Sequence, residues 1–229
     1  MIDSLPFTYR SEKKFIISDI DRIKLHHLIK SNRGLFSEVF YERRVNNIYL
    51  DYYDLDNYFR HVSGNSKRYK IRIRWYGNFF GFIEKPVLEF KMKEGDMGIK
   101  KEFKLVSFEM KKEDDLNPLV SKVFEKSNLP PDILEILKTT KSFLLNSYLR
   151  SYYSSSNKKV RLTVDRDLLL KPIFSHKIPK IMGEPDRRTF IIELKYNNGD
   201  ETYVSQISQD FPFRVQENSK YINGINGII

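Results

Sequence analysis

The stretch Tyr69-Lys70-Ile71-Arg72-Ile73-Arg74-Trp75-Tyr76-Gly77 alternates basic and β-branched residues before an aromatic end. Successive side chains of a β-strand point to opposite faces, so a strand here places Arg72 and Arg74 on one face and Ile71 and Ile73 on the other. The apolar face can pack on a core. The two guanidinium groups lie ~7 Å apart on the opposite face, where their repulsion favours a negative group between them.

Most of the other predicted strands show the same alternation. Including the opening stretch, strands are expected at residues 8–17, 45–51, 69–76, 87–93, 99–106, 143–154, 159–170 and 189–196. Their charged faces also carry carboxylates. If these faces met bulk water, they would form an ordinary solvated surface. If the sheet closed with them inward, they would line a basic tunnel suited to a polyanion and a metal ion.

The composition indicates an anionic partner. The 229 residues carry a net charge of +10 with a pI near 9.5, which favours nucleic acid, anionic lipid or a phosphorylated small molecule. The absence of cysteine excludes disulfides and thiolate chemistry. No apolar run approaches the ~20 residues of a membrane span, and the N-terminal residues lack a signal-peptide profile. The expected protein is therefore soluble and cytoplasmic.

Helices are expected between the strands. Ser18-x-x-Asp21 resembles a capping box and predicts a helix that Gly34 ends. Its predicted buried stripe comprises Ile20, Ile23, Leu28 and Ile29. Further helices are expected to start near Asp54, Asn117, Pro130 and Asp200. Because no linker or repeat interrupts the chain, residues 1–229 are predicted to form one α+β domain. The expected architecture is a closed antiparallel eight-stranded β-barrel with helices packed outside.

The motif at residues 72–77, preceded by Ile48-Tyr49-Leu50-Asp51 and a short helix, resembles the vacuolar transporter chaperone (VTC) polyphosphate polymerase domain. That domain belongs to the triphosphate tunnel metalloenzymes. The matching motifs continue in order as Glu89-x-Lys91, Lys100 before Glu102-Phe103, Tyr148-x-Arg150, Arg161-x-Thr163-x-Asp165, Glu193-x-Lys195 and Ser219-Lys220-Tyr221. Each motif is short, but their order and spacing from about Tyr9 to the C-terminus make the set specific.

The resemblance implies an ATP-dependent polyphosphate polymerase, which transfers the γ-phosphate of ATP to a growing polyphosphate chain. The residues that would hold the triphosphate are Lys14, Arg72, Arg74, Lys91, Lys100, Tyr148, Arg150 and Arg161. Lys195 offers a further point charge, while Ser219 and Lys220 match tail residues that close on the terminal phosphates. The residues expected to act in catalysis are Arg72, Arg74, Lys91, Arg150, Arg161, Glu193 and Lys220. Glu193 matches the carboxylate that binds Mn²⁺ or Mg²⁺.

These residue types suit phosphoryl transfer, which asks the protein mainly for positioning and charge neutralisation. Arginine presents a planar fork to phosphate oxygens, and lysine presents a point charge. The remaining carboxylates on the charged faces either bind metal or hold neighbouring cations in place. They are Glu12, Glu89, Glu102 and Asp165.

Two positions depart from the patterns of the relatives. The hydrolases and cyclases carry an N-terminal Glu-x-Glu-x-Lys, where this chain has Arg10-x-Glu12-x-Lys14. The change removes one metal ligand and disfavours triphosphatase or adenylate cyclase activity. Glu217 stands where the eukaryotic polymerase has a lysine, which puts the efficiency of chain handling in question.

Two alternatives remain open. One is a tunnel triphosphatase that hydrolyses inorganic or nucleoside triphosphate, and the other is a non-catalytic module that binds polyphosphate or RNA. Carboxylates on the basic faces would repel RNA, so no nucleic-acid partner is expected. The expected ligands are ATP and inorganic polyphosphate or triphosphate, with a membrane-bound partner for product export as a further expectation.

Overall fold

The computed structural model describes residues 10–94, 97–173, 177–179 and 182–226. The chain forms two compact units, each assembled from three segments. Unit 1 comprises Met1–Arg43, Leu149–Leu168 and Asp186–Asn218, and unit 2 comprises Arg44–Tyr148, Leu169–Pro185 and Ser219–Ile229. Three long strands, β2, β8 and β9, contribute residues to both units.

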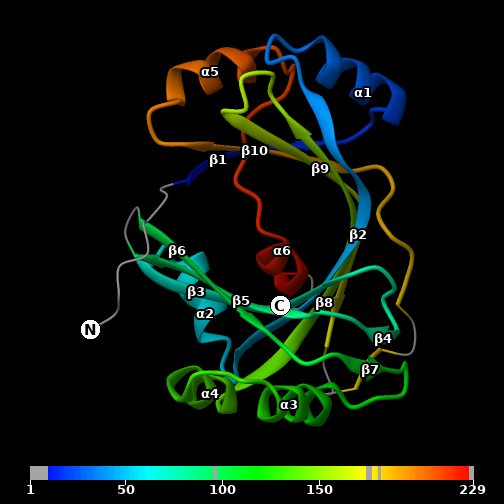
Figure 1. Cartoon of the computed structure of the whole chain (residues 1–229), viewed down its shortest axis with the longest axis vertical. Helices are drawn as coiled ribbons and strands as arrows, with labels where there is room; N and C mark the ends of the chain where they lie inside the picture. The colour runs from blue at the N-terminus through cyan, green and yellow to red at the C-terminus, as the bar shows by residue number, and fades with distance from the viewer. Residues whose placement is uncertain (1–9, 95–96, 174–176, 180–181, 227–229) are drawn as a thin grey trace. The chain divides into compact units, whose positions relative to one another are not determined.

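The eight strands predicted from the alternating pattern form one sheet, in the order β1-β10-β9-β8-β2-β3-β5-β6 (Figure 1). Their bounds are β1 Arg10–Ile17, β2 Ser37–Tyr52, β3 Lys67–Tyr76, β5 Val87–Glu94, β6 Met97–Lys104, β8 Thr140–Ser154, β9 Val160–Pro172 and β10 Phe190–Asn197. Short strands β4 (Gly81–Ile83) and β7 (Phe108–Met110), which the sequence did not predict, pair with each other. The α+β class and the large antiparallel sheet are thus confirmed.

The sheet is not closed, so the expected barrel closure is not found. Among the described residues, β1 and β6 are the two ends of the strand order, and no ladder joins them. Both strands are rich in lysine, including Lys13 and Lys14 in β1 and Lys100 and Lys101 in β6. Charged side chains on edge strands oppose further strand pairing, which accounts for the open edges.

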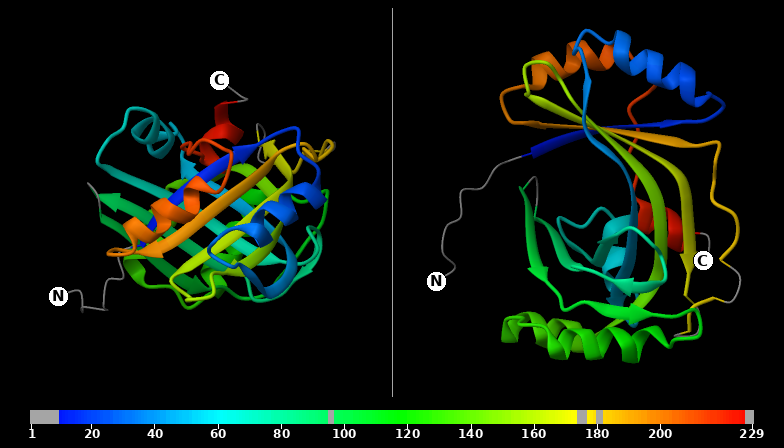
Figure 2. Two further views of the ribbon diagram at one scale, coloured as in Figure 1. Left: turned by 90° about the horizontal axis from the view of Figure 1, so that it is seen from above. Right: turned by 45° about the vertical axis from the view of Figure 1, so that its right-hand side comes forward.

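In unit 1, helices α1 (Arg22–Ser31) and α5 (Glu201–Gln209) lie side by side on one face of the strands (Figure 2). Leu25 and Ile29 of α1 join Val204 and Ile207 of α5 in a core with strand residues such as Leu162. The alternate residues of these strands, which include the predicted cations and carboxylates, therefore lie on the opposite face.

In unit 2, the sheet is covered on both faces. Helices α3 (Leu116–Lys126) and α4 (Pro131–Lys138) pack on the face that carries Ile48 and Leu145. Helix α6 (Lys220–Asn226) packs on the face that carries Tyr49 and Leu144, together with α2 (Asp56–Val62). Since Ile48 and Tyr49 are consecutive in one strand, the two sets of helices cover opposite faces. Arg72 pairs with Tyr49 in the β2–β3 ladder and shares its face with α6.

Helix boundaries differ from the predictions in three ways. Asp21, and not Ser18, is the N-cap of α1, and its side chain accepts a hydrogen bond from the Lys24 N–H. Ile23, predicted to be buried, is 72% exposed, because α1 turns the face with Leu25 and Ile29 toward the core. The helix α6 was not predicted. Residues 8 and 9 of the first predicted strand lie outside the described residues, as does the side chain of Arg10.

None of the described helices has the length and apolar character that a membrane crossing requires.

Candidate functional site

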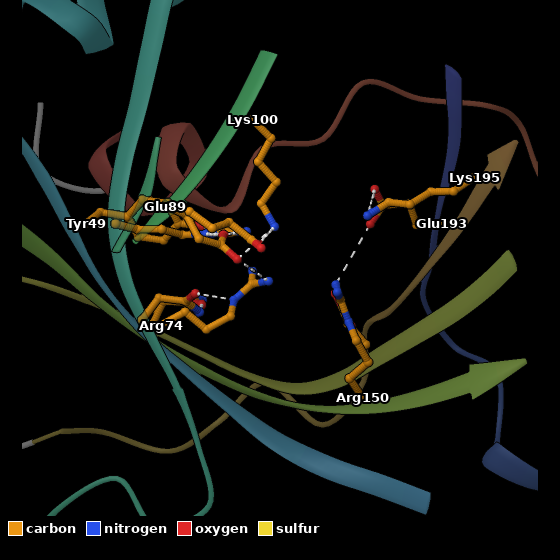
Figure 3. A network of polar contacts seen from close by, with 12 residues as sticks. Tyr49, Arg74, Glu89, Lys100, Arg150, Glu193 and Lys195 are labelled. Atoms are coloured by element: carbon orange, nitrogen blue, oxygen red, sulfur yellow. Dashed lines mark hydrogen bonds and ion pairs between the residues drawn. The ribbon is translucent and has the colours of Figure 1, made fainter. Parts of the chain in front are cut away.

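A single buried carboxylate organises the cations of unit 2. Glu89 of β5 is 3% exposed and accepts hydrogen bonds from Arg72 Nε at 2.6 Å, Arg74 Nη1 at 3.2 Å and Lys100 Nζ at 2.9 Å. Strand register produces this arrangement, because Arg72 of β3 lies opposite Glu89 and Glu89 lies opposite Glu102 of β6. Figure 3 shows Arg74 and Lys100 pointing to Glu89.

The surrounding positive charge stabilises the ionised form of Glu89. Burial tends to raise the pKa of Glu89, but Arg72, Arg74 and Lys100 outweigh burial and hold that pKa far below its usual value. The pKa of Arg72 is raised, although burial opposes the shift, because Tyr49, Glu89 and Tyr148 favour its charged form. Both shifts favour the charged forms of Glu89 and Arg72.

A row of lysines adjoins this cluster. In the ladders, Lys70 of β3 lies opposite Lys91 of β5, and Lys91 lies opposite Lys100 of β6. Like charges directly opposite each other in a sheet are destabilising, and a bound anion relieves this repulsion. Lys91 and Lys100 are both exposed and thus accessible to a ligand.

Neutral side chains orient the two arginines. Arg72 Nη1 donates to the Tyr49 hydroxyl at 3.1 Å, and Arg74 Nε donates to Asn47 Oδ1 at 3.1 Å. The amide of Asn47 in turn donates to Asn146 Oδ1 at 2.8 Å. Both asparagines are fully buried. The guanidinium of Arg74 is therefore oriented by a buried chain of hydrogen bonds.

Helix α6 brings Lys220 to the same unit. The ammonium of Lys220 lies 4.7 Å from the centre of the Tyr148 ring, within the range of a cation–π interaction. Ser219 precedes the helix, and its hydroxyl accepts a hydrogen bond from the Ile222 N–H at 3.4 Å. Tyr221 stacks on Tyr49, with 5.3 Å between ring centres.

Unit 1 contains a second charged cluster. Arg150 of β8 binds Asp165 of β9 in a bidentate pair, with Nε–Oδ1 at 2.5 Å and Nη2–Oδ2 at 2.7 Å. The same guanidinium lies 3.8 Å from Glu193 Oε2, and Lys195 Nζ lies 3.3 Å from Glu193 Oε1 (Figure 3). Lys14 Nζ contacts Glu12 Oε1 at 2.6 Å.

The strand register sets two neighbouring rows of polar residues in unit 1. Glu12 of β1 lies opposite Lys195 of β10, which lies opposite Arg161 of β9. The adjacent row contains Lys14, Glu193 and Thr163.

The electrostatic setting of Glu193 favours its carboxylate. Burial tends to raise the pKa of Glu193, but Lys195, a hydrogen bond from Glu12, Arg150 and Lys14 hold it well below the usual value. Glu12 lies in the neighbouring row of the β1–β10 ladder, where its carboxylate contacts Lys14. Beside them, the buried Thr163 hydroxyl has no hydrogen-bond partner among the described residues.

The predicted site residues thus fall into two groups. Unit 1 holds Lys14, Arg150, Arg161, Glu193 and Lys195, and unit 2 holds Arg72, Arg74, Lys91, Lys100, Tyr148, Ser219 and Lys220. Arg150 and Glu193 are buried, whereas Arg161 is exposed. Tyr148 is 1% exposed and receives Lys220 over its ring.

The carboxylates whose role was left open mainly contact cations. Glu89 contacts three, Asp165 contacts Arg150, and Glu102 contacts Lys100. Sequence reasoning did not select Tyr49, Asn47, Asn146 or Asp51, because uncharged or isolated polar residues carry no periodic signal. The alternation of strand 45–51, which places Tyr49 and Asp51 in one phase, was the available clue.

Both clusters can bind phosphate oxygens through charge-assisted hydrogen bonds. Among the described residues, no group of three or more His, Cys, Asp or Glu could hold a metal ion. A divalent cation here would therefore need ligands from a bound phosphate in addition to Glu193 and Glu12, which is common for Mg²⁺.

The large antiparallel sheet, with helices packed on its faces, defines an α+β protein with basic residues on the polar strand faces. The VTC domain matches residues 9–229, and the chain belongs to the VTC domain family. This result confirms the family expected from the sequence motifs.

Two solved structures show similarity to this chain over most of their length. One is the PH1819 protein of Pyrococcus horikoshii OT3, with 16% identity, 95% of this chain and 98% of that chain covered, and a TM-score of 0.48. Another is a candidate adenylate cyclase from Vibrio parahaemolyticus, with 12% identity, 96% and 98% covered, and a TM-score of 0.50. At 12% identity, this second likeness concerns the fold alone. No curated protein matches the chain.

Proposed function

We propose that this protein is a metal-dependent polyphosphate polymerase, which transfers the γ-phosphate of ATP to the end of a polyphosphate chain. The observation that carries the proposal is the Glu89-centred cluster of Arg72, Arg74 and Lys100 within a VTC domain. Three cations share the buried carboxylate of Glu89, and further lysines lie in the adjacent row, which supports the binding of a triphosphate at this site.

The residues of unit 1 fit a divalent metal ion, Mn²⁺ or Mg²⁺. Glu12 and Glu193 lie in neighbouring rows of the β1–β10 ladder, and the Thr163 hydroxyl, opposite Glu193, is buried without a hydrogen-bond partner in the described part of the chain. Two carboxylates and a hydroxyl are oxygen donors of the kind that these ions prefer. Glu193 and Glu12 would hold the ion, which when bound neutralises charge on phosphate oxygens.

The protein's own residues would act by positioning and charge neutralisation. Arg72 and Arg74 are held rigidly and present their remaining N–H groups to phosphate oxygens. Arg150, fixed by Asp165, has the same role in unit 1. Lys91, Lys100, Arg161 and Lys220 supply charge along the polyanion. These cations would stabilise the negative charge of the terminal phosphates during transfer, and a phosphate-ended acceptor would be the nucleophile.

The test is incubation of the protein with ATP and Mn²⁺, followed by gel electrophoresis for polyphosphate and an assay for free phosphate. We expect polymer and ADP, with little free phosphate early in the reaction. Stoichiometric free phosphate without polymer at any primer concentration would establish a triphosphatase instead. Binding of polyphosphate without any turnover would establish a non-catalytic module.

Two variants test in the same assay whether Glu193 binds the metal ion. Glu193→Gln keeps the shape of the side chain but removes its charge, so we expect a folded protein without metal-dependent turnover. Glu109→Gln, which changes an exposed carboxylate of β7, is the matched control and should retain full activity. Near-normal activity of Glu193→Gln at low Mn²⁺ would contradict the metal-binding role.

A further inference from the structure

The carboxylate of Asp51 lies at the end of β2, is fully buried and is surrounded by donors. Its Oδ1 accepts from the backbone N–H of Tyr52 at 2.7 Å and of Asn57 at 3.1 Å. Its Oδ2 accepts from the Tyr58 N–H at 2.9 Å and from the Tyr221 hydroxyl. One carboxylate therefore joins β2, the start of α2 and helix α6. With no exposed surface, Asp51 cannot itself contact a ligand.

Two of the hydrogen bonds to Asp51 cap the start of α2. The N-cap residue of α2, Leu55, has a left-handed backbone and provides no side-chain cap. Asp51 takes over that function by accepting from the N–H groups of Asn57 and Tyr58. The hydrogen bond with Tyr221 is not needed for this cap, so it requires another explanation.

Helix α6 depends on tertiary contacts for its position. It has seven residues, and a helix of this length is not stable by itself in water. Tyr221 at its start donates to Asp51, and Asn226 at its end accepts from the Tyr58 hydroxyl at 2.6 Å. Tyr58 also binds Asp51 through its backbone N–H. The start of α6 is thus bonded directly to Asp51, and its end is connected to Asp51 through Tyr58.

The position of α6 determines where Lys220 lies. Lys220 immediately precedes Tyr221, and its ammonium is placed over the Tyr148 ring. The Tyr221 ring stacks on Tyr49, whose hydroxyl accepts from Arg72. The residue that bonds to Asp51 is therefore adjacent to Lys220 in α6, and it is connected to Arg72 through the Tyr49 ring.

We infer that Asp51, acting through the Tyr221 hydroxyl, positions Lys220 for binding of inorganic triphosphate. This role makes Asp51 and Tyr221 positioning residues, and it rests on the proposed function because the ligand is the same polyanion. A negatively charged carboxylate that faced the ligand would repel an anion. The charge of Asp51 is instead enclosed by four donors, and its effect reaches the ligand only through the placement of α6.

The test uses the full chain and inorganic triphosphate as the probe, with affinity measured by calorimetry. Tyr221→Phe removes only the hydroxyl and retains both the ring stack on Tyr49 and the cap of α2. We expect Lys220→Ala to weaken binding about tenfold and Tyr221→Phe to weaken it about threefold or more. In the double variant, Tyr221→Phe should add no further loss, because the lysine that it positions is absent.

Tyr153→Phe is the matched control, since Tyr153 is also a buried tyrosine whose hydroxyl bonds to a carboxylate, Glu38. It should leave triphosphate affinity unchanged. Asp51→Asn retains an acceptor for Tyr221 and should bind more tightly than Asp51→Ala. If Asp51→Ala fails to fold, the triphosphate affinity of Tyr221→Phe still tests the inference.

An unchanged affinity in Tyr221→Phe, with normal binding by the unaltered chain, would overturn the inference and leave the proposed function standing. An equal loss in the presence and absence of Lys220 would also overturn it, because the hydroxyl would then act independently of the lysine. Failure of the unaltered chain to bind triphosphate would overturn the proposed function and the inference together.

Discussion

At the scale of residues, the two arginines of the Glu89 cluster can be tested one at a time for a contribution to triphosphate binding. Arg74 is held by Asn47 and Glu89, and its side chain is 11% exposed. Removal of a charge-assisted phosphate contact costs about 1.5–3 kcal/mol. We therefore expect Arg72→Ala or Arg74→Ala to weaken triphosphate binding by about tenfold to a hundredfold in calorimetry.

The control for the arginine variants is Arg60→Ala, which removes an exposed ion pair with Asp56 in α2 of the same unit. It should bind triphosphate normally. Unchanged affinity in both Arg72→Ala and Arg74→Ala would show that these arginines do not contact the ligand.

The depressed pKa of Glu89 predicts an acid-dependent loss of stability. A carboxylate whose pKa is lower in the folded state stabilises that state above the unfolded-state pKa, and this contribution disappears as the pH falls through the folded-state value. Glu89→Gln should reduce the free energy of unfolding at pH 7 by about 1–3 kcal/mol. The difference from the unaltered protein should shrink below about pH 4.3.

Urea unfolding at a series of pH values measures this difference. Glu102→Gln is the control, because the Glu102 side chain is 53% exposed. Among the described residues, its ion pair is with Lys100. It should change stability by less than about 0.5 kcal/mol. A Glu89→Gln effect that stays constant with pH would argue against an ionised Glu89 stabilised by its neighbours.

At the scale of elements, the close packing of α6 on β8 predicts a sensitive position. A Cβ atom added at Gly224 would lie 2.5 Å and 2.6 Å from the two δ carbons of Leu144. Gly224→Ala should therefore displace α6, cost about 1–3 kcal/mol of stability and weaken triphosphate binding through Lys220. Thermal unfolding and calorimetry measure the two effects.

The second-site variant Leu144→Ala makes space for the added methyl group. In the Gly224→Ala background it should restore triphosphate affinity, although the altered core remains less stable. Asn223→Ala, an exposed position of the same helix, should have little effect on either measurement. Normal affinity in Gly224→Ala would show that the placement of α6 does not govern binding.

At the scale of the whole molecule, the net charge of +10 predicts a strong dependence on salt. A long polyphosphate would contact more of the cations on the strand faces than inorganic triphosphate can reach. Screening by added salt should therefore weaken binding of long polyphosphate more steeply than binding of triphosphate. Titrations from about 50 to 200 mM salt test this comparison. If the affinities for long polyphosphate and for triphosphate fell equally steeply with salt concentration, the additional phosphates would make no contact with the protein.

Local periodicity was sufficient to predict the strands and their two faces. The eight strands of the large sheet were predicted because charged and apolar residues alternate along most of them. The same alternation correctly grouped Arg72 with Arg74 and Glu193 with Lys195. It also selected Glu89 and Asp165 as carboxylates near cations, although it could not say which cation each would contact.

The sequence by itself therefore determined the eight strands of the large sheet, their polar and apolar faces and the VTC family, but not α6, β4 or β7. Only the tertiary structure decided the shared use of Glu89 by three cations, the open edges of the sheet and the attachment of α6 to Asp51. Strand register sets the Glu89 cluster, and residues 51 and 221, far apart in the chain, form their hydrogen bond only after folding. Such contacts leave no local pattern, because periodicity reports which face a residue occupies but not which distant residue it meets.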